Sequence, residues 1–64
     1  MFVRTPFDLG TTLREHRRRL GLGQQQLADR VGVSRQWLID MERGKPRGEL
    51  GLVLKTLDAL GLRL

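Results

Sequence analysis

The sequence contains no cysteine, two prolines and three aromatic residues, and none of its apolar runs is long. Without cysteine, neither a disulfide nor a thiolate metal site can stabilise the fold, and the absence suits the reducing cytoplasm. No apolar stretch approaches the roughly 20 residues that a membrane-spanning helix needs. Arg4, Pro6 and Asp8 interrupt the N-terminal stretch, so we expect no signal peptide there. These absences predict a cytoplasmic protein that does not enter a membrane.

Side chains that carry out chemistry are equally scarce. His16 is the only histidine, and neither cysteine nor a cluster of carboxylates accompanies it, so we expect no metal site. The sequence has no nucleophile–base pair and no glycine-rich loop of the kind that cradles phosphate. We therefore expect neither an enzyme nor a cofactor.

Positive charge, in contrast, is in excess, with a formal net charge of +5. Residues 1–48 contain ten Lys/Arg and five Asp/Glu, whereas residues 49–64 contain two of each. A basic body followed by a neutral, apolar tail fits a polyanion-binding surface with a separate packing or pairing segment. Because such a surface attracts polyanions without identifying them, charge alone leaves an ordinary solvated surface equally open.

Apolar residues recur at helical spacing in four segments, which predicts an all-α, compact four-helix domain over residues 9–60. A glycine follows each segment, as is common where helices end. Asp8 is the expected cap of the first helix and Ser34 that of the third. The predicted helices are 9–20, 24–31, 35–43 and 49–60.

The two ends of the chain carry weaker signals. Pro6 disfavours helix at the residue before it, which predicts an N-terminal arm over residues 1–8. Residues 61–64 are predicted as a short strand, because apolar and polar residues alternate from Leu62 to Leu64. A domain of 64 residues without disulfides or metal is marginally stable alone, so tight packing or oligomerisation is expected.

The second and third predicted helices have the pattern of a helix-turn-helix. Two such helices cross through a tight turn, which requires a small residue at the crossing and a glycine in the turn. Ala28 and Gly32 meet these requirements four residues apart. Apolar residues also stand at the positions from which both helices would pack against the rest of the domain, namely Leu27, Val31, Val33, Leu38 and Met41.

The segment from Gly21 to Arg35, followed by Met41 to Lys45, resembles the Xre/Cro helix-turn-helix family. The resemblance extends over residues 9–60 and implies a λ-repressor-like fold. Two positions depart from the family pattern. Gly23 replaces the usual capping Thr or Ser, and Ile39 occupies a position that is usually polar.

The ending, from Gly44 to Leu64, resembles the HipB-type antitoxins. In that subgroup a short C-terminal strand pairs with its copy across a two-fold axis, which implies a homodimer. The tail also has more apolar residues than one narrow helix stripe can bury in a monomer. The resulting dimer-interface prediction is Leu52, Leu60, Leu62 and Leu64.

The family resemblance places the N-terminus of the third helix in the DNA major groove. Arginine can bond guanine bidentately, glutamine can bond adenine, and a carboxylate can accept from cytosine N4. A carboxylate near phosphates is usually repelled, and each of these side chains can also be an ordinary exposed residue. The predicted base-contact residues are Ser34, Arg35, Gln36 and Asp40.

A second group of residues is predicted to contact the DNA backbone, which positions a protein without specifying sequence. For Trp37 the alternative is packing against the first helix. Arg17 and Glu42 have a different role, because the resemblance implies a partly buried salt bridge between the first and third helices. The backbone-contact residues are Gln24, Gln25, Trp37, Arg43, Lys45 and Arg47.

The leading functional hypothesis is a dimeric repressor of an inverted-repeat operator in double-stranded DNA, with recognition helices about 34 Å apart. The HipB resemblance further implies an antitoxin that represses its own operon and neutralises a HipA-type serine/threonine kinase toxin. A stand-alone Xre-type regulator and an interaction module without DNA binding are the alternatives. RNA binding is disfavoured, because no aromatic residues are arranged for base stacking.

Overall fold

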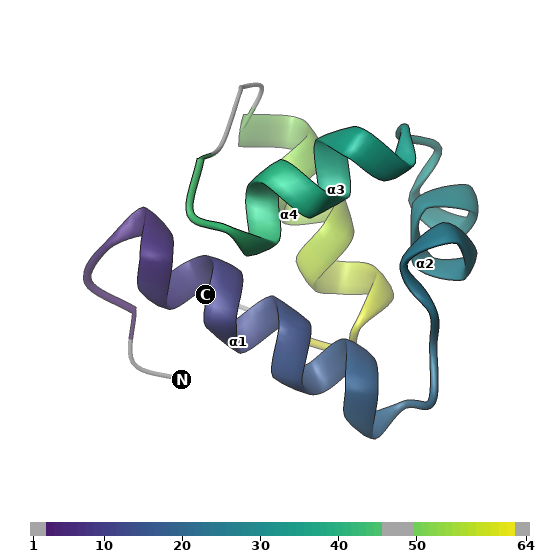
Figure 1. Ribbon diagram of the computed structural model, residues 1–64, viewed down its shortest axis with the longest axis horizontal. Helices are drawn as coiled ribbons and strands as arrows, with labels where there is room; N and C mark the ends of the chain where they lie inside the picture. The colour runs from purple at the N-terminus through teal and green to yellow at the C-terminus, as the bar shows by residue number, and fades with distance from the viewer. Residues whose placement is uncertain (1–2, 46–49, 63–64) are drawn as a thin grey trace.

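The computed structural model describes residues 3–45 and 50–62, which form four helices (Figure 1). They are α1 (Pro6–Arg19), α2 (Gln24–Val31), α3 (Arg35–Glu42) and α4 (Leu50–Ala59). The predicted all-α, four-helix fold is confirmed. Gly61 and Leu62 form no strand, and the rest of the predicted strand lies outside the described residues. None of the described helices has the length and apolar character to cross a membrane.

Helix α1 begins at Pro6, three residues before the predicted start, so the predictions of a capping Asp8 and of an arm reaching residue 8 were wrong. The cap is Thr5, whose Oγ1 accepts from the backbone N–H of Asp8 at 3.0 Å. Proline suits the first helical position, because its fixed φ is helical and its missing N–H would have no partner there. Thr5 is extended, as a residue before proline tends to be. The Met1–Phe2 part of the predicted arm lies outside the described residues.

Helices α2 and α3 begin where the sequence predicted. Gly32 ends α2 in the left-handed conformation at φ 84°, which glycine adopts without steric cost. Ser34 caps α3, since its Oγ accepts from the backbone N–H of Trp37 at 3.0 Å. Helices α3 and α4 each end one residue earlier than predicted, and Glu49 lies outside the described residues.

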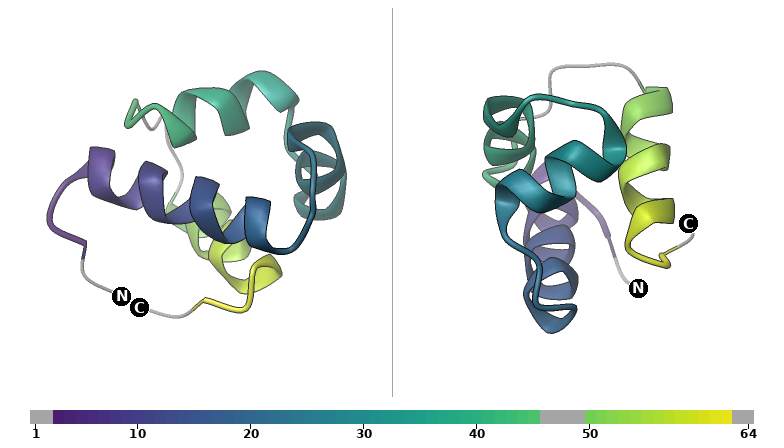
Figure 2. Two further views of the ribbon diagram at one scale, coloured as in Figure 1. Left: turned by 60° about the horizontal axis from the view of Figure 1, so that its bottom comes forward. Right: turned by 90° about the vertical axis from the view of Figure 1, so that its right-hand side faces the viewer.

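The core lies where the four helices converge. Each helix contributes leucine, and the turn after α1 adds Leu22. Helix α3 packs against α1 and α2, and α4 packs against α2. Figure 2 shows α1 and α3 running side by side with α2 closing one end of the pair. The buried apolar residues are Leu13, Leu22, Leu27, Ala28, Val31, Leu38, Met41, Val53, Leu57 and Leu60.

Two glycines allow the backbones of α1 and α3 to approach closely. A Cβ added at Gly10 would lie 2.5 Å from the carbonyl oxygen of Met41 and 2.6 Å from that of Glu42. Gly44, at φ 80°, lies against the start of α1, where an added Cβ would come within 2.8 Å of the Cα of Phe7. Only glycine fits at these two positions, so the two glycines determine how closely the backbone of α3 can approach that of α1.

The predicted dimer surface is partly occupied within the single chain. Leu60 is only 6% exposed and belongs to the core, so its assignment to the dimer interface was wrong. Leu52 and Leu62 are half-buried, and Leu64 lies outside the described residues. Leu54, which the interface prediction did not include, is 45% exposed.

Candidate nucleic-acid interface

The tight turn between α2 and α3 presents the first residues of α3 to solvent. The N–H groups of Gly32 and Val33 both donate to the carbonyl oxygen of Ala28, at 2.8 and 3.0 Å. Ala28 is fully buried at this corner, as its predicted place at the helix crossing requires. Arg35 and Gln36 follow directly after the Ser34 cap, and both are exposed.

One turn further along α3, Asp40 lies beside Gln36. The Nε2 of Gln36 donates to the Oδ1 of Asp40 at 3.0 Å. Asp40 is half-buried, whereas Gln36 is exposed. The predicted base-contact residues Arg35, Gln36 and Asp40 therefore all lie on α3, and Gln36 is hydrogen-bonded to Asp40.

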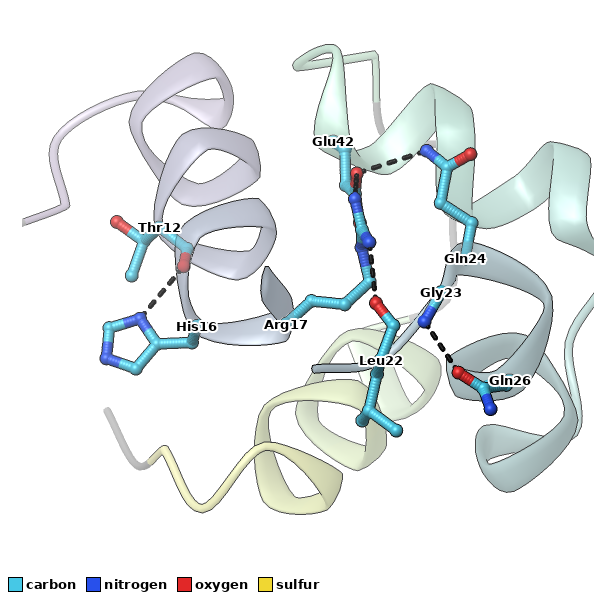
Figure 3. Close-up of polar contacts among 8 residues, drawn as sticks. All are labelled: Thr12, His16, Arg17, Leu22, Gly23, Gln24, Gln26 and Glu42. Atoms are coloured by element: carbon cyan, nitrogen blue, oxygen red, sulfur yellow. Dashed lines mark hydrogen bonds and ion pairs between the residues drawn. The ribbon is translucent and has the colours of Figure 1, made fainter. Parts of the chain in front are cut away.

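A buried polar network holds α3 against the N-terminal half of the domain (Figure 3). The Nε and Nη2 of Arg17 donate to the two carboxylate oxygens of Glu42 at 2.7 and 3.1 Å. Both side chains are less than a tenth exposed. The predicted bridge is thus present, in the bidentate geometry that makes arginine–carboxylate pairs strong and directional.

Two further contacts extend this network to the start of α2. The Nη1 of Arg17 donates to the carbonyl oxygen of Leu22 at 2.8 Å. The Nε2 of Gln24, the first residue of α2, donates to Glu42 at 3.2 Å. Among the described residues, no buried side-chain nitrogen or oxygen lacks a hydrogen-bond partner. The carboxylate of Glu42 on α3 thereby accepts hydrogen bonds from side chains of both α1 and α2.

The cap of α2 is weaker, since Gly23 has no side chain to offer. The Oε1 of Gln26 accepts from the backbone N–H of Gly23 at 2.8 Å, which satisfies one group at this helix end. Gln25, also in the first turn, is exposed and donates from Nε2 to Asp29 at 2.8 Å.

Trp37 is half-buried and packs against the hydrophobic core. The predicted DNA-backbone contact of Trp37 and the alternative, packing against the first helix, both stay predictions. His16 likewise has a structural contact, because its Nδ1 donates to the carbonyl oxygen of Thr12 at 2.9 Å (Figure 3). No group of three or more potential metal ligands occurs in the described part of the chain.

Basic residues follow α3 directly. Arg43 is the C-cap residue of α3, and Lys45 comes two residues later. Both side chains are exposed. Backbone hydrogen bonds from Gly44 to Met41 and from Lys45 to Asp40, at 3.1 and 2.9 Å, close the chain tightly over the end of the helix. The predicted backbone contact at Arg47 lies outside the described residues.

The sequence prediction missed a cleft of about 580 Å³ that opens between α1 and α3. Arg14 and Arg18 line it from α1, and neither was assigned a role. The available signal was their four-residue spacing, which places both on one helix face with Arg17. Ile39, one of the two departures from the family pattern, is half-buried and lines the α3 side.

A family model described as a helix-turn-helix domain matches residues 8–63 of the chain. An HTH-type transcriptional regulator of Sinorhizobium fredii, y4mF, is 39% identical over 59 residues. The matched part covers 92% of this chain and 78% of that regulator.

Solved structures agree in fold. The restriction-modification controller protein C.AhdI of Aeromonas hydrophila is 34% identical with a TM-score of 0.82, covering 91% of this chain and 88% of that one. A chain of the HipA–HipB–O2–O3 complex has a TM-score of 0.86 at 22% identity and covers all of this chain and 90% of its own. At that identity the likeness concerns the fold alone.

Proposed function

Because this chain belongs to the Xre-like helix-turn-helix domain family, we propose that it is a homodimeric, sequence-specific repressor that binds an inverted-repeat operator in duplex DNA in the cytoplasm. The observation that carries the proposal is the placement of Arg35 and Gln36. Both are exposed at the capped start of α3, and a buried bidentate bridge holds the far end of the same helix against α1. A recognition helix needs this combination of exposed reading residues and a fixed orientation.

Arg35 and Gln36 contact base edges in this proposal. Arginine bonds the O6 and N7 of guanine bidentately, and glutamine bonds adenine through its amide. Ser34, whose Oγ also caps α3, is a further base-contact residue in this proposal. Asp40 contributes to specificity, either by accepting from cytosine N4 or through its contact with Gln36.

The backbone contacts come from both sides of the recognition helix. At the start of α2, Gln24 and Gln25 and the free backbone N–H groups of the helix end face a phosphate. After α3, Arg43, Lys45 and Arg47 contact phosphates further along the strand, and Trp37 borders the same surface. These contacts determine position and orientation, and the base contacts determine sequence.

Dimerisation places the two recognition helices one turn of DNA apart, about 34 Å. The proposed interface uses the exposed apolar side of α4 and the C-terminal residues. Leu52, Leu62 and Leu64 remain in it, and Leu54 joins them because 45% of it is exposed. Leu60 is excluded, since it lies in the core of one chain.

A second activity distinguishes an antitoxin from a stand-alone regulator. The resemblance of the C-terminal segment to the HipB-type antitoxins favours an antitoxin that also binds a HipA-type serine/threonine kinase. The stand-alone alternative shares the DNA-binding activity and lacks the kinase partner. Co-purification with the product of a neighbouring kinase-like gene separates the two, because only an antitoxin retains the kinase through gel filtration.

DNA binding is tested by titrating the protein with duplex from its own upstream region and with a scrambled duplex. We expect selective, salt-dependent binding of one dimer per inverted repeat. Arg35→Ala is expected to lower affinity for the operator by about 1–3 kcal/mol and to relax base preference at one position. Lys45→Ala is the matched control, and it is expected to weaken binding to both duplexes equally. Equal, weak binding of the wild type to both duplexes would contradict the proposal.

A further inference from the structure

The cleft between α1 and α3 extends beyond the residues to which the proposed function assigns DNA contacts. Two of its lining residues, Arg14 and Arg18, come from the face of α1 that carries Arg17. On the opposite side lie Arg35 and Ile39 of α3 and Arg43 directly after it, spaced four residues apart. Gln24 and Glu42 complete the lining, which joins the cleft to the start of α2.

The charge in this cleft is unbalanced. Five arginines line it against one carboxylate, which gives a formal charge of +4. Arg17 is already paired, because it forms a salt bridge with Glu42 through two hydrogen bonds. The other four arginines are exposed, and none of them makes an ion pair among the described residues. Cations gathered on one concave surface attract an anion, and binding of that anion relieves their mutual repulsion.

We propose that Arg14 and Arg18 each bind a phosphate group of the DNA backbone, so that the operator is held by α1 as well as by α3. This inference rests on the proposed function and extends it to a helix outside the helix-turn-helix. A duplex that contacts Arg35 with its bases and Gln24 with a phosphate passes over the mouth of the same cleft. Arginine suits that position, since its guanidinium bonds two phosphate oxygens at once.

The neighbouring Arg19 provides a matched control. Arg19 is exposed, lies in the last turn of α1 together with Arg18 and carries the same charge, but it does not line the cleft. Arg14→Ala, Arg18→Ala and Arg19→Ala therefore remove equal charge from one helix, and Arg18 and Arg19 are sequence neighbours that differ in whether they line the cleft. Thermal unfolding of each variant, followed by circular dichroism, establishes that the helices are intact.

The experiment measures the affinity of the wild type and the three variants for the operator duplex and for a scrambled duplex at several salt concentrations. The slope of log affinity against log salt falls by about 0.9 for each phosphate that the protein no longer neutralises, or roughly 1.8 when both subunits of a dimer are changed. We expect this decrease for Arg14→Ala and for Arg18→Ala on both duplexes, and a smaller change for Arg19→Ala. Arg14→Lys is expected to restore most of the slope, because it retains the charge.

The outcomes separate this inference from the function on which it rests. If the wild type binds the operator selectively and the two cleft variants behave like Arg19→Ala, the phosphate site is wrong and the repressor function stands. If the cleft variants lose affinity for the operator alone with an unchanged slope, they do not bind phosphate. A wild type without salt-dependent binding to either duplex would overturn both proposals.

Discussion

Helices α3 and α4 are held in the domain by contacts of different kinds. Helix α3 is fixed at its start by the Ser34 cap and at its end by the bidentate contact of Glu42 with Arg17. Helix α4 contributes Val53 and Leu57 to the core, and Leu60 directly after it adds a third apolar side chain. These apolar contacts do not depend on direction as hydrogen bonds do. The one fully buried polar residue of α4, Thr56, donates to its own helix through Leu52 at 2.8 Å.

The difference corresponds to what the proposed function requires of each helix. A hydrogen bond depends on angle as well as distance, so a network of them determines how a helix is rotated and where it ends. Burial of apolar area depends mainly on how much surface is removed from water. A helix that presents side chains to base edges needs the first kind of constraint. A helix that completes the core and pairs with a second subunit needs mainly the second.

Breaking the polar network should have the largest effect. Arg17→Met leaves Glu42 charged, buried and without its main partner, which is expected to cost about 3–5 kcal/mol of unfolding free energy. Urea unfolding followed by the fluorescence of Trp37, the only tryptophan, measures this loss.

A double variant guards against failure of the single variant to fold. Arg17→Met with Glu42→Leu removes both charges and should recover most of the stability, since apolar replacements of buried pairs are often tolerated. We expect this double variant to bind DNA less selectively, because Gln24 then has no acceptor that ties it to α3. A double variant as unstable as Arg17→Met would mean that shape, and not charge pairing, governs this site.

Truncating a buried leucine of α4 should lower the free energy of unfolding without altering the base preference of DNA binding. Leu57→Ala removes a side chain that is 1% exposed, which is expected to cost about 2–5 kcal/mol. At a temperature where the variant is folded, its ranking of operator variants should match that of the wild type in a competition binding assay. A changed ranking would show that α4 helps to orient the recognition helix, and the contrast between the two helices would fail.

The smallest expected effect concerns the start of α2, where the family's capping hydroxyl is missing. Gly23 has an extended backbone at φ −76° and ψ 164°, and an added Cβ would meet only Gln26, at 3.6 Å. Gly23→Ser should therefore stabilise the domain by a few tenths of a kcal/mol, seen as a small rise in Tm. Gly21→Ser is the control, because its φ of 71° makes any side chain unfavourable, and it should lower Tm. A Gly23→Ser variant with a lower Tm would mean that the Gln26 contact is the better cap.

Much of the helix-turn-helix followed from local sequence signals. The bounds of α2, the left-handed Gly32 and the Ser34 cap were all predicted, because each depends on residues within one turn of the chain. The same kind of signal failed at α1, where Pro6 was taken as evidence for an extended arm although proline is also favoured at the first helical position. Pro6 is compatible with both an extended arm and a helix start, and only the packing of the segment decides between the two.

Contacts between distant residues were decided by the tertiary structure. Gly10 could not be recognised as essential, because its need for glycine comes from the backbone of Met41 and Glu42, which is distant in the sequence. Leu60 was assigned to a dimer surface because an apolar residue at a helix end does not reveal which partner covers it. The arginine cleft is likewise a property of two helix faces brought together. The sequence by itself determined that there are four helices, where α2 and α3 begin, and which side chains follow the Ser34 cap, since these are local. Which faces meet, and where charge gathers, was decided only by packing, since it depends on residues that are far apart in the chain.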